Sequence, residues 1–311
     1  MTGIDSAETA GRRIEPSSRL ADFQHERRRL VRLAYRMLGS VSEAEDVAQD
    51  AWLKWEQVEG GIDSPAAYLT RIVTRLCLDR IKSARSRRET YIGPWLPDPL
   101  VGSIDPDETI ADDITMTLML AMERLSPLER AAFLLHDVFD VALSDVAVTL
   151  SREPAAVRQL ASRARKHVQA ARPRFSVEAA EARRITQAFF VAARDGDTAS
   201  LASLLAQDVE IHSDGGGKVL AFRNVIRGAD RVLRLFAGLR RKNAPAAELL
   251  RTAEIDGLPG YISVDRGLVQ TTALDIRRGK IAAIYIVRNP DKLQHLTGNM
   301  IAEIDQPRPR P

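Results

Sequence analysis

Cysteine is almost absent from this sequence, and long apolar runs are absent altogether. The single cysteine, Cys77, excludes an internal disulfide, and no closely spaced Cys or His stands near it to complete a zinc site. No uncharged apolar stretch approaches the ~20 residues that span a bilayer, and the first residues lack the apolar segment of a signal peptide. We therefore expect a cytoplasmic protein without a metal, a cofactor or a membrane partner.

Charge is concentrated in a few places, although the net charge of +3 says little by itself. An acidic group lies at Glu43, Glu45, Asp46 and Asp50. The basic residues form two groups, Lys82, Arg85, Arg87 and Arg88, and then Arg152, Arg158, Arg163, Arg165, Lys166, Arg172 and Arg174. This distribution predicts phosphate contacts at two places and a basic protein partner at a third.

Two stretches of the chain, residues 20–88 and 112–172, have apolar residues at helical spacing. In the first stretch we expect Ser42 to cap a second helix and Pro65 to open a third. The second stretch is interrupted at Ser126-Pro127, near Asp140, and from Ser151 to Pro154. The pattern predicts two all-α domains, preceded by a flexible arm at residues 1–19.

Residues 89–111 separate the two helical domains and are rich in glycine and proline, which predicts a linker. The linker is not a featureless spacer. It contains the run Trp95-Leu96-Pro97-Asp98-Pro99-Leu100, whose large apolar side chains a solvated spacer would not need.

Residues 181–298 differ in character and predict an α+β domain. Helical stretches at 182–193 and 198–205 come first. Alternating or β-branched runs follow at 209–211, 261–264, 269–276 and 281–287. We expect a hairpin turn from Arg277 to Lys280 between the last two runs. A C-terminal tail follows at 299–311, and its part from Gln306, with alternating proline and arginine, is expected to be disordered.

The last helix of the second domain has two different faces. Its apolar stripe consists of Val157, Leu160, Ala161, Ala164 and Val168. The opposite face carries Ala155, Gln159, Ser162 and Lys166, with Arg158 and Arg163 at its flanks. A small outward residue near the helix start allows a close approach to base edges, and long polar side chains can read bases or bind phosphates. The pattern alone equally fits a basic, solvated helix.

The segments from Leu125 to Phe139 and from Ala155 to Arg165 resemble the fourth domain of extracytoplasmic-function (ECF) sigma factors. The resemblance implies recognition of the promoter minus-35 element by Arg152, Ala155, Arg158, Gln159, Ser162, Arg163 and Lys166. Two positions depart from the family pattern. Ser151 stands where a turn glycine is common, and Glu153 replaces the usual capping serine, which makes a poorer cap and brings negative charge toward DNA.

The first domain resembles sigma domain 2 of the same family in Ala34 to Ser40 and in Glu43 to Trp52. Asp46, Gln49 and Asp50 are spaced i, i+3 and i+4, so they share one helix face. Spacing alone also fits a solvated acidic face. The resemblance implies that this face binds a basic coiled coil of core RNA polymerase, where charges set orientation and association rate more than affinity.

The segment from Tyr68 to Arg80, followed by basic residues, is similar to the promoter-melting part of sigma domain 2. Melting without ATP requires pockets that trap flipped bases and cations that hold the single strand. Arg75 stands where asparagine is frequent in the family. The resemblance implies that the minus-10 element is bound by Arg71, Thr74, Arg75, Lys82, Arg85, Arg87 and Arg88.

The third domain resembles the cone-shaped SnoaL-like fold related to nuclear transport factor 2. Its short motifs resemble those of ECF sigma factors with this extension, which implies an intramolecular contact with the linker or the sigma core. The glycine triplet lacks the spacing and the Lys-Ser/Thr ending of a P-loop. The implied regulatory interface consists of Trp95, Leu96, Pro97, Asp98, Pro99 and Leu100, then Asp214, Gly215, Gly216, Gly217 and Lys218, then Asn289, Pro290, Asp291, Lys292 and Leu293.

The sequence therefore predicts a non-enzymatic sigma factor that binds core RNA polymerase and promoter DNA and is modulated by its third domain. Two alternatives stay open. One is an enzyme fused to a DNA-binding module, with His212, Asp214 and Asp275 as the candidate acid and base groups in a deep polar pocket. The other is a helix-turn-helix regulator that binds operators without polymerase. Neither a separate anti-sigma protein nor a small-molecule ligand can be predicted from these residues.

Overall fold

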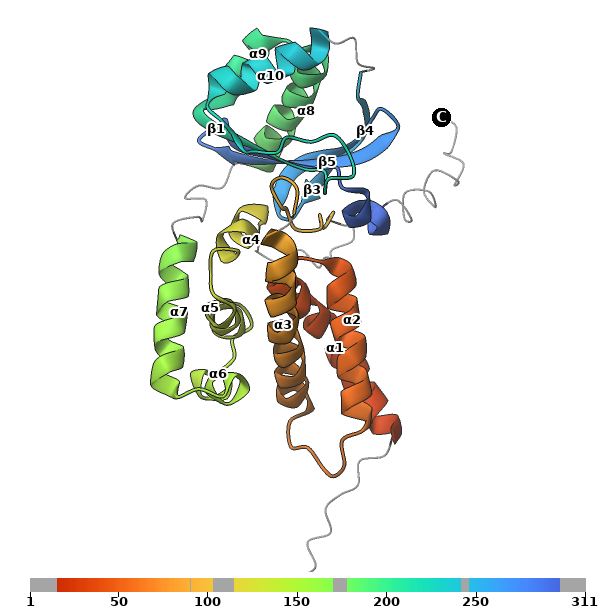
Figure 1. The fold of residues 1–311 in the computed structure, drawn as a ribbon, viewed down its shortest axis with the longest axis vertical. Coiled ribbons are helices and arrows are strands. Elements are labelled where there is room, and N and C mark those ends of the chain that lie inside the picture. The colour runs from red at the N-terminus through yellow and green to blue at the C-terminus, as the bar shows by residue number, and fades with distance from the viewer. Residues whose placement is uncertain (1–15, 90, 103–114, 170–177, 242–245, 297–311) are drawn as a thin grey trace, which may run out of the picture. The chain divides into compact units, whose positions relative to one another are not determined.

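The computed structural model describes residues 16–89, 91–102, 115–169, 178–241 and 246–296, which are drawn in colour in Figure 1. The chain divides into two compact units. The first combines Met1–Ser83 with Ser126–Ala164, and the second combines Ala84–Leu125 with Arg165–Pro311. Most of the arm at 1–19 and all of the tail at 299–311 lie outside the described residues.

The first unit opens with three helices, α1 (Pro16–Leu38), α2 (Val41–Glu56) and α3 (Pro65–Glu89). Large side chains that are fully buried form their common core, among them Leu30, Met37 and Trp55. Cys77 is buried in α3, and burial raises the pKa of its thiol. This cysteine is therefore an apolar packing residue.

The starts of α2 and α3 test two of the expected helix signals. Pro65 opens α3 as predicted, because a proline at the first helical position loses no intrahelical hydrogen bond. The prediction for Ser42 was wrong. Gly39, with φ at 72°, ends α1, and this leaves Ser40 as the extended residue before α2. Ser42 consequently lies inside the first turn.

Three helices of the helix-turn-helix segment follow in the first unit, α5 (Pro127–Phe133), α6 (Leu143–Leu150) and α7 (Pro154–Gln169). The breaks between them fall where the sequence predicted. Ser126 and Glu129 form a reciprocal capping box at the start of α5, and α5 continues as a π-helical turn at Leu134–Val138. Ser151 ends α6 in the left-handed conformation, with φ at 52°.

Two arginines connect α1 with α5 and the turn that follows it, inside the first unit. Buried Arg130 donates a hydrogen bond of 2.8 Å to the carbonyl oxygen of Met37. The guanidinium of Arg36 lies 5.3 Å from the ring centroid of Phe139. The bond from Arg130 satisfies one of the free carbonyl groups at the end of α1, and both contacts join the two helical segments.

The second unit is built on a six-stranded sheet with the order β2-β1-β6-β5-β4-β3. Its strands are β1 (Leu205–Asp214), β2 (Ile226–Arg227), β3 (Glu248–Ile255), β4 (Leu258–Asp265), β5 (Leu268–Arg277) and β6 (Lys280–Val287). β1 and β6 pair in parallel, and the other pairs are antiparallel. The predicted turn between β5 and β6 is confirmed, with positive φ at Arg278 and Gly279.

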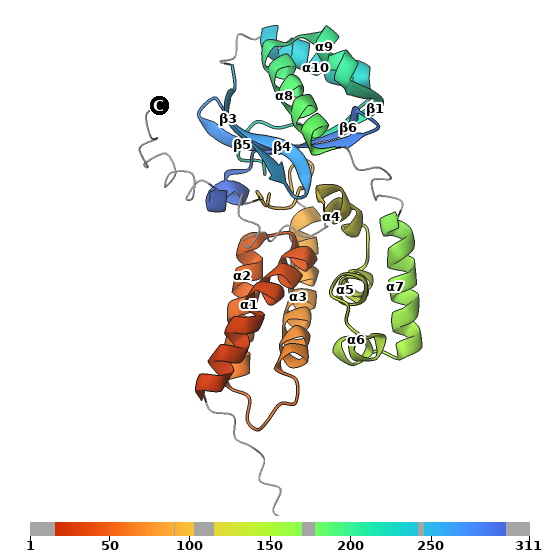
Figure 2. The ribbon, with the colours of Figure 1, turned by 180° about the vertical axis from the view of Figure 1, so that it is seen from behind.

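Each face of this sheet is covered by different parts of the chain. Helices α8 (Ala179–Asp195), α9 (Thr198–Leu204) and α10 (Ala229–Arg241) cover one face, as both views show (Figures 1 and 2). The other face is covered by linker residues 91–102, by α4 (Met116–Met122) and by a short helix at 290–296. Leu96, Met116 and Leu293 are buried there.

Among the described residues, no helix combines the length and apolar character that a membrane crossing requires.

Candidate functional site

Asp46, Gln49 and Asp50, which were predicted to form an acidic face on α2, all reach the surface in the structure. Asp46 and Asp50 keep 65% and 46% of their side-chain surface exposed, and Gln49 is exposed beside them. Arg80 of α3, which the sequence did not suggest, reaches both carboxylates at 3.6 Å and 2.7 Å. Because these ion pairs are largely solvated, they contribute little to folding. The carboxylates are therefore oriented by Arg80 and remain accessible to a cationic partner.

The candidate minus-10 residues divide by burial. Arg75 and Lys82 are exposed on α3, and Arg71 is half-buried. Thr74 is fully buried and donates its hydroxyl to the carbonyl oxygen of Thr70 at 2.7 Å, so the structure places it in the core of this helix bundle. The side chains of Arg85, Arg87 and Arg88 lie outside the described residues.

Helix α7 has the two faces that its sequence predicts. Val157, Ala161, Ala164 and Val168 are buried, while Leu160 is half-buried. The exposed set includes every candidate minus-35 residue: Arg152, Ala155, Arg158, Gln159, Ser162, Arg163 and Lys166. A cationic and amide-bearing surface along one helix face has the chemistry needed to contact phosphates and base edges in a major groove.

A buried carboxylate, Asp214, holds the linker to the end of β1. It is 0% exposed. One carboxylate oxygen accepts hydrogen bonds from the Leu96 amide at 2.8 Å and the Lys292 ammonium at 2.9 Å. The other accepts from the Tyr91 hydroxyl at 2.5 Å and the Gly216 amide at 3.0 Å. Burial, followed by this bond to Asp214, raises the pKa of Tyr91. The carboxylate thus bonds two points of the linker at once.

Further contacts extend the attachment along the linker. Lys292 also donates to the carbonyl oxygen of Leu96 and lies 4.2 Å from the ring centroid of Trp95. The remaining contacts are Asn289 to the Tyr91 hydroxyl at 3.0 Å, His295 with the carbonyl oxygen of Pro99 at 2.9 Å, and the Leu100 amide to Asp256 at 3.1 Å. We call Asp214, Asp256, Asn289, Lys292 and His295 the linker seat.

The glycine triplet permits the linker to approach this closely. A Cβ atom on Gly216 would lie 2.3 Å from the side-chain amide nitrogen (Nδ2) of Asn289. A Cβ atom on Gly217 would lie 2.9 Å from the side chain of Ile92. Both glycines also have positive φ. Side chains at these positions would displace Asn289 and Ile92. The three motifs that the sequence analysis singled out, from the linker, from β1 and from the end of β6, therefore meet in one place.

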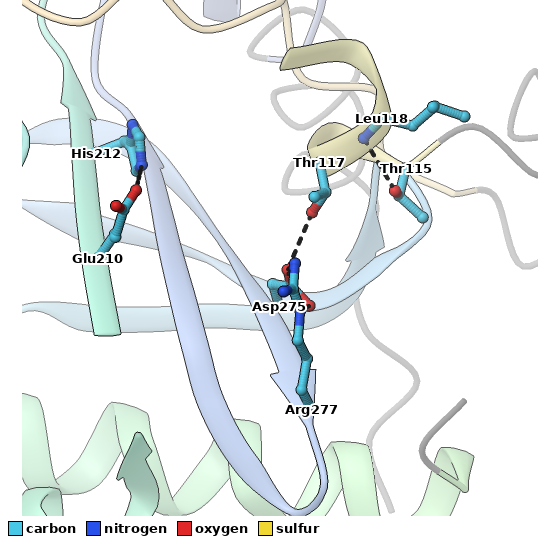
Figure 3. Close-up of polar contacts among 7 residues, drawn as sticks. All are labelled: Thr115, Thr117, Leu118, Glu210, His212, Asp275 and Arg277. Carbon is cyan, nitrogen blue, oxygen red and sulfur yellow. Dashed lines mark hydrogen bonds and ion pairs between the residues drawn. The ribbon is translucent and has the colours of Figure 1, made fainter. Parts of the chain in front are cut away.

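Helix α4 is attached to the same face of the sheet, as Figure 3 shows. Thr115 caps it by accepting a hydrogen bond from the Leu118 amide at 3.3 Å. Thr117 donates to Asp275 of β5 at 3.3 Å, and Asp275 is paired with Arg277 at 2.7 Å. The amide of Met116 donates to the carbonyl oxygen of Asp256. Although α4 precedes the helix-turn-helix segment in the chain, it packs with the sheet of the second unit.

The three residues proposed for catalysis do not form one site. His212 bonds Glu210 at 3.1 Å and stacks on Tyr285, and burial lowers its pKa. Asp214 is occupied by the linker. Asp275 is occupied by Thr117 of α4, as Figure 3 shows. The cavity between the sheet and helices α8 and α10 is lined by other residues. The arrangement serves attachment of the linker and α4.

Comparison with known proteins follows the same division of the chain. Sigma-70 region 2 matches residues 23–87, and sigma-70 region 4 matches residues 115–168. The ECF RNA polymerase sigma factor SigJ of Mycobacterium tuberculosis is 38% identical over 299 residues, which cover 91% of this chain and 95% of SigJ. The chain belongs to the ECF family of RNA polymerase sigma factors.

One further relative and a crystal structure of SigJ agree. The probable sigma factor SigI of M. tuberculosis is 36% identical over 287 residues, covering 90% of this chain and 96% of SigI. The crystal structure of M. tuberculosis SigJ superposes with a TM-score of 0.70 at 35% identity, covering 88% of this chain and 98% of that chain. The predicted fold class is confirmed as two helical sigma domains followed by an α+β domain with a six-stranded sheet.

Family membership decides between the functions left open by the sequence. This sigma factor directs promoter recognition by RNA polymerase, and sigma factors are not enzymes. Polymerase and promoter DNA are its partners as a member of the family. The sequence analysis missed several residues of the attachment, namely Tyr91, Thr117, Asp256 and His295. Each is ordinary in its own segment, so only the folded topology reveals its partner.

Proposed function

We propose that this sigma factor is regulated from within, by a C-terminal domain that holds the linker and the first helix of region 4 on its sheet. The observation that carries the proposal is Asp214, a buried carboxylate whose two oxygens accept from Tyr91 and Leu96 of the linker and from Lys292 of the domain. A carboxylate that stays buried is costly to leave without its donors, so the attached state is well defined.

Attachment limits how the two promoter-binding regions can be arranged. If they were free, the 26 residues between α3 and α4 (90–115) could extend over roughly 90 Å. Residues 91–102 and α4 are instead held against the same sheet. Regions 2 and 4 must reach two promoter elements that lie apart on the DNA, and release of the linker gives them the reach to do so. The seated linker is therefore the restrained state.

The surfaces that would act after release follow from the exposed residues. Asp46, Gln49 and Asp50 are proposed to bind the basic coiled coil of core polymerase. Exposed Arg75 and Lys82 are proposed to hold the minus-10 strand, together with Arg71, Arg85, Arg87 and Arg88. The exposed face of α7 is proposed to bind the minus-35 element, with phosphate contacts from its arginines and base contacts from Gln159. Thr74 is buried, and it supports the helix rather than the DNA.

The experiment is promoter-directed transcription by core polymerase reconstituted with variants of the full chain. Asp214→Asn removes the charge opposite Lys292 and should release the linker, which raises the yield of transcript about threefold or more at limiting sigma factor. A chain ending after Asn289, which lacks Lys292 and His295, should behave in the same way. A chain cut near Phe175, which lacks the whole domain, should also differ from the full chain.

The matched control is Asp208→Asn, which makes the same chemical change at an exposed position of the same strand. It should leave the yield of transcript unchanged. Equal yields from the full chain, from Asp214→Asn and from both shortened chains would overturn the proposal. A rise in yield that Asp208→Asn shares would do so as well.

A further inference from the structure

A cavity of about 150 Å³ lies in the second unit, between the sheet and helices α8 and α10. This is the volume that accommodates a benzene-sized ligand. Its walls include two edge-to-face aromatic pairs, Phe189 with Phe236 at 5.8 Å and Phe190 with Tyr261 at 5.1 Å between ring centroids. Rings packed in this way form a rigid apolar wall. The cavity therefore suits an apolar ligand group the size of one aromatic ring.

One end of the cavity is polar. Arg288, which directly follows β6, donates to Asp265 at 2.7 Å and to the carbonyl oxygen of Leu220 at 3.1 Å. Its Nε–H is buried and has no hydrogen-bond acceptor among the described residues. A buried donor without an acceptor is costly, and a ligand oxygen would remove that cost.

The charge around the cavity favours an anion. Its lining contains four arginines and one aspartate. Asp195, which is outside the lining, pairs with Arg194 at 2.7 Å. The four arginines and the two aspartates, Asp265 and Asp195, together leave a net charge of +2 around the cavity. The arginines are Arg194, Arg240, Arg266 and Arg288.

We propose that this cavity is a binding site for a small aromatic monocarboxylate, whose ring packs on the phenylalanines and whose carboxylate accepts a hydrogen bond from Arg288. An anionic acceptor makes a stronger bond to a guanidinium than a neutral one does. The carboxylate is further attracted by the arginines of the rim, of which Arg240 is exposed.

The site is placed to influence the linker seat, because the two lie on opposite faces of the same strands. Along β1, Ser213 lines the cavity and the next residue, Asp214, bonds the linker. At the end of β6, Arg288 lines the cavity and the next residue, Asn289, bonds Tyr91. The amides of Arg288 and Asn289 both donate to the carbonyl oxygen of Asp214. A ligand that fixes Arg288 thus fixes the backbone that carries the seat.

The effect of the ligand on the linker seat, which we call the coupling, rests on the proposed function. The binding of the ligand does not. Binding is measured by calorimetry on the full chain, without polymerase or DNA, with benzoate as the probe and benzamide as its neutral counterpart. Benzoate should bind saturably and about tenfold or more tightly than benzamide. Hydrogen exchange should then show slower exchange in the linker segment 91–102 when benzoate is bound.

Two pairs of variants locate the site. Ala193→Phe fills the cavity and should abolish binding. Ala199→Phe places the same ring at an exposed position of α9 and should leave binding unchanged. Arg240→Gln should weaken the binding of benzoate but not that of benzamide. Arg231 is exposed on the same helix but lies outside the lining, so Arg231→Gln should change the binding of neither compound. These four substitutions should disturb folding less than a substitution of Arg288, whose side chain is half-buried and ion-paired with Asp265.

The outcomes separate the two proposals. Absence of saturable benzoate binding, or binding that survives Ala193→Phe, would overturn the ligand site while leaving the transcription test of Asp214→Asn unaffected. Benzoate binding with unchanged exchange in 91–102 would overturn the coupling. A failed transcription test with benzoate binding intact would remove the regulatory proposal and leave a ligand site.

Discussion

At Ser151 the backbone is held in a conformation that its side chain disfavours. The residue ends α6 with φ at 52°, in the left-handed region where a Cβ atom costs about 1–2 kcal/mol and glycine has no such cost. Its hydroxyl has only a long contact of 3.4 Å with Arg75 to offset this. The sequence analysis marked the position because a glycine is common there, and the structure supplies the physical reason.

We predict that Ser151→Gly stabilises the helix-turn-helix segment. The free energy of unfolding should rise by about 0.5–1 kcal/mol, since relief of the left-handed strain exceeds the extra chain entropy that glycine loses on folding. Urea denaturation measures the change. Ser162→Gly, at an exposed position inside α7, should have the opposite sign and lower the free energy of unfolding by about 0.5 kcal/mol. A destabilised Ser151→Gly would contradict the argument.

Residue by residue, the candidate site was predictable to different extents. Asp214, Asn289 and Lys292 could be named because their motifs resemble those of a family. Tyr91 and Asp256 could not, since an isolated tyrosine in a linker or an aspartate in a turn carries no signal of its own. Thr74 was assigned from resemblance to the DNA-binding set, and its burial shows that alignment with a motif does not determine which way a helix residue points.

At the scale of elements, most of the helices and strands of the second unit were predicted from their apolar patterns, but not all of them. Helices α8 and α9 and strands β1, β4, β5 and β6 fall on the predicted stretches. Helix α10 was missed, although Val232, Phe236 and Leu239 have helical spacing within it. Strand β3 lies at the edge of the sheet and is mostly half-exposed, with charged residues in its sequence. Its pairing with β4 depends on contacts that a local pattern does not contain.

The acidic face of α2 gives a prediction at this scale. Asp46→Lys combined with Asp50→Lys should weaken binding to core polymerase about tenfold or more, because the like charges then slow association with a basic coiled coil. The chain should still fold, since the ion pairs with Arg80 are partly solvated and contribute roughly 0–1 kcal/mol each. Association rates with immobilised core polymerase at low salt measure the effect.

The control is Glu56→Lys, a charge reversal at an exposed position at the end of the same helix. It should leave the association rate within about twofold. DNA binding by the double variant should persist or strengthen, because its net charge becomes more positive. Undiminished polymerase binding by the double variant would place the contact elsewhere on the chain.

At the scale of the whole molecule, the C-terminal domain is incomplete without residues that precede the helix-turn-helix segment. Leu96 and Met116 are fully buried with Leu258, Tyr285 and Leu293 on one face of the sheet. Segments nearly 200 residues apart in sequence share this core, as the bond between Asn289 and Tyr91 shows. Their meeting follows from the strand order, which places the ends of β1 and β6 side by side, and no local pattern predicts that order.

This shared core predicts that the chain stays together after it is cut. A protease recognition sequence inserted within residues 170–177 would allow cleavage between α7 and α8. The two fragments should co-elute in size-exclusion chromatography at micromolar concentration, because linker and α4 side chains remain buried against the sheet. Leu96→Asp with Lys292→Ala should separate the cleaved fragments, since it places an uncompensated charge in that core and removes the cation bound to Asp214. Separation of the unsubstituted fragments would show that the linker seat alone does not hold the linker. If the fragments co-elute, the cleaved protein should give the same transcript yield as the intact protein.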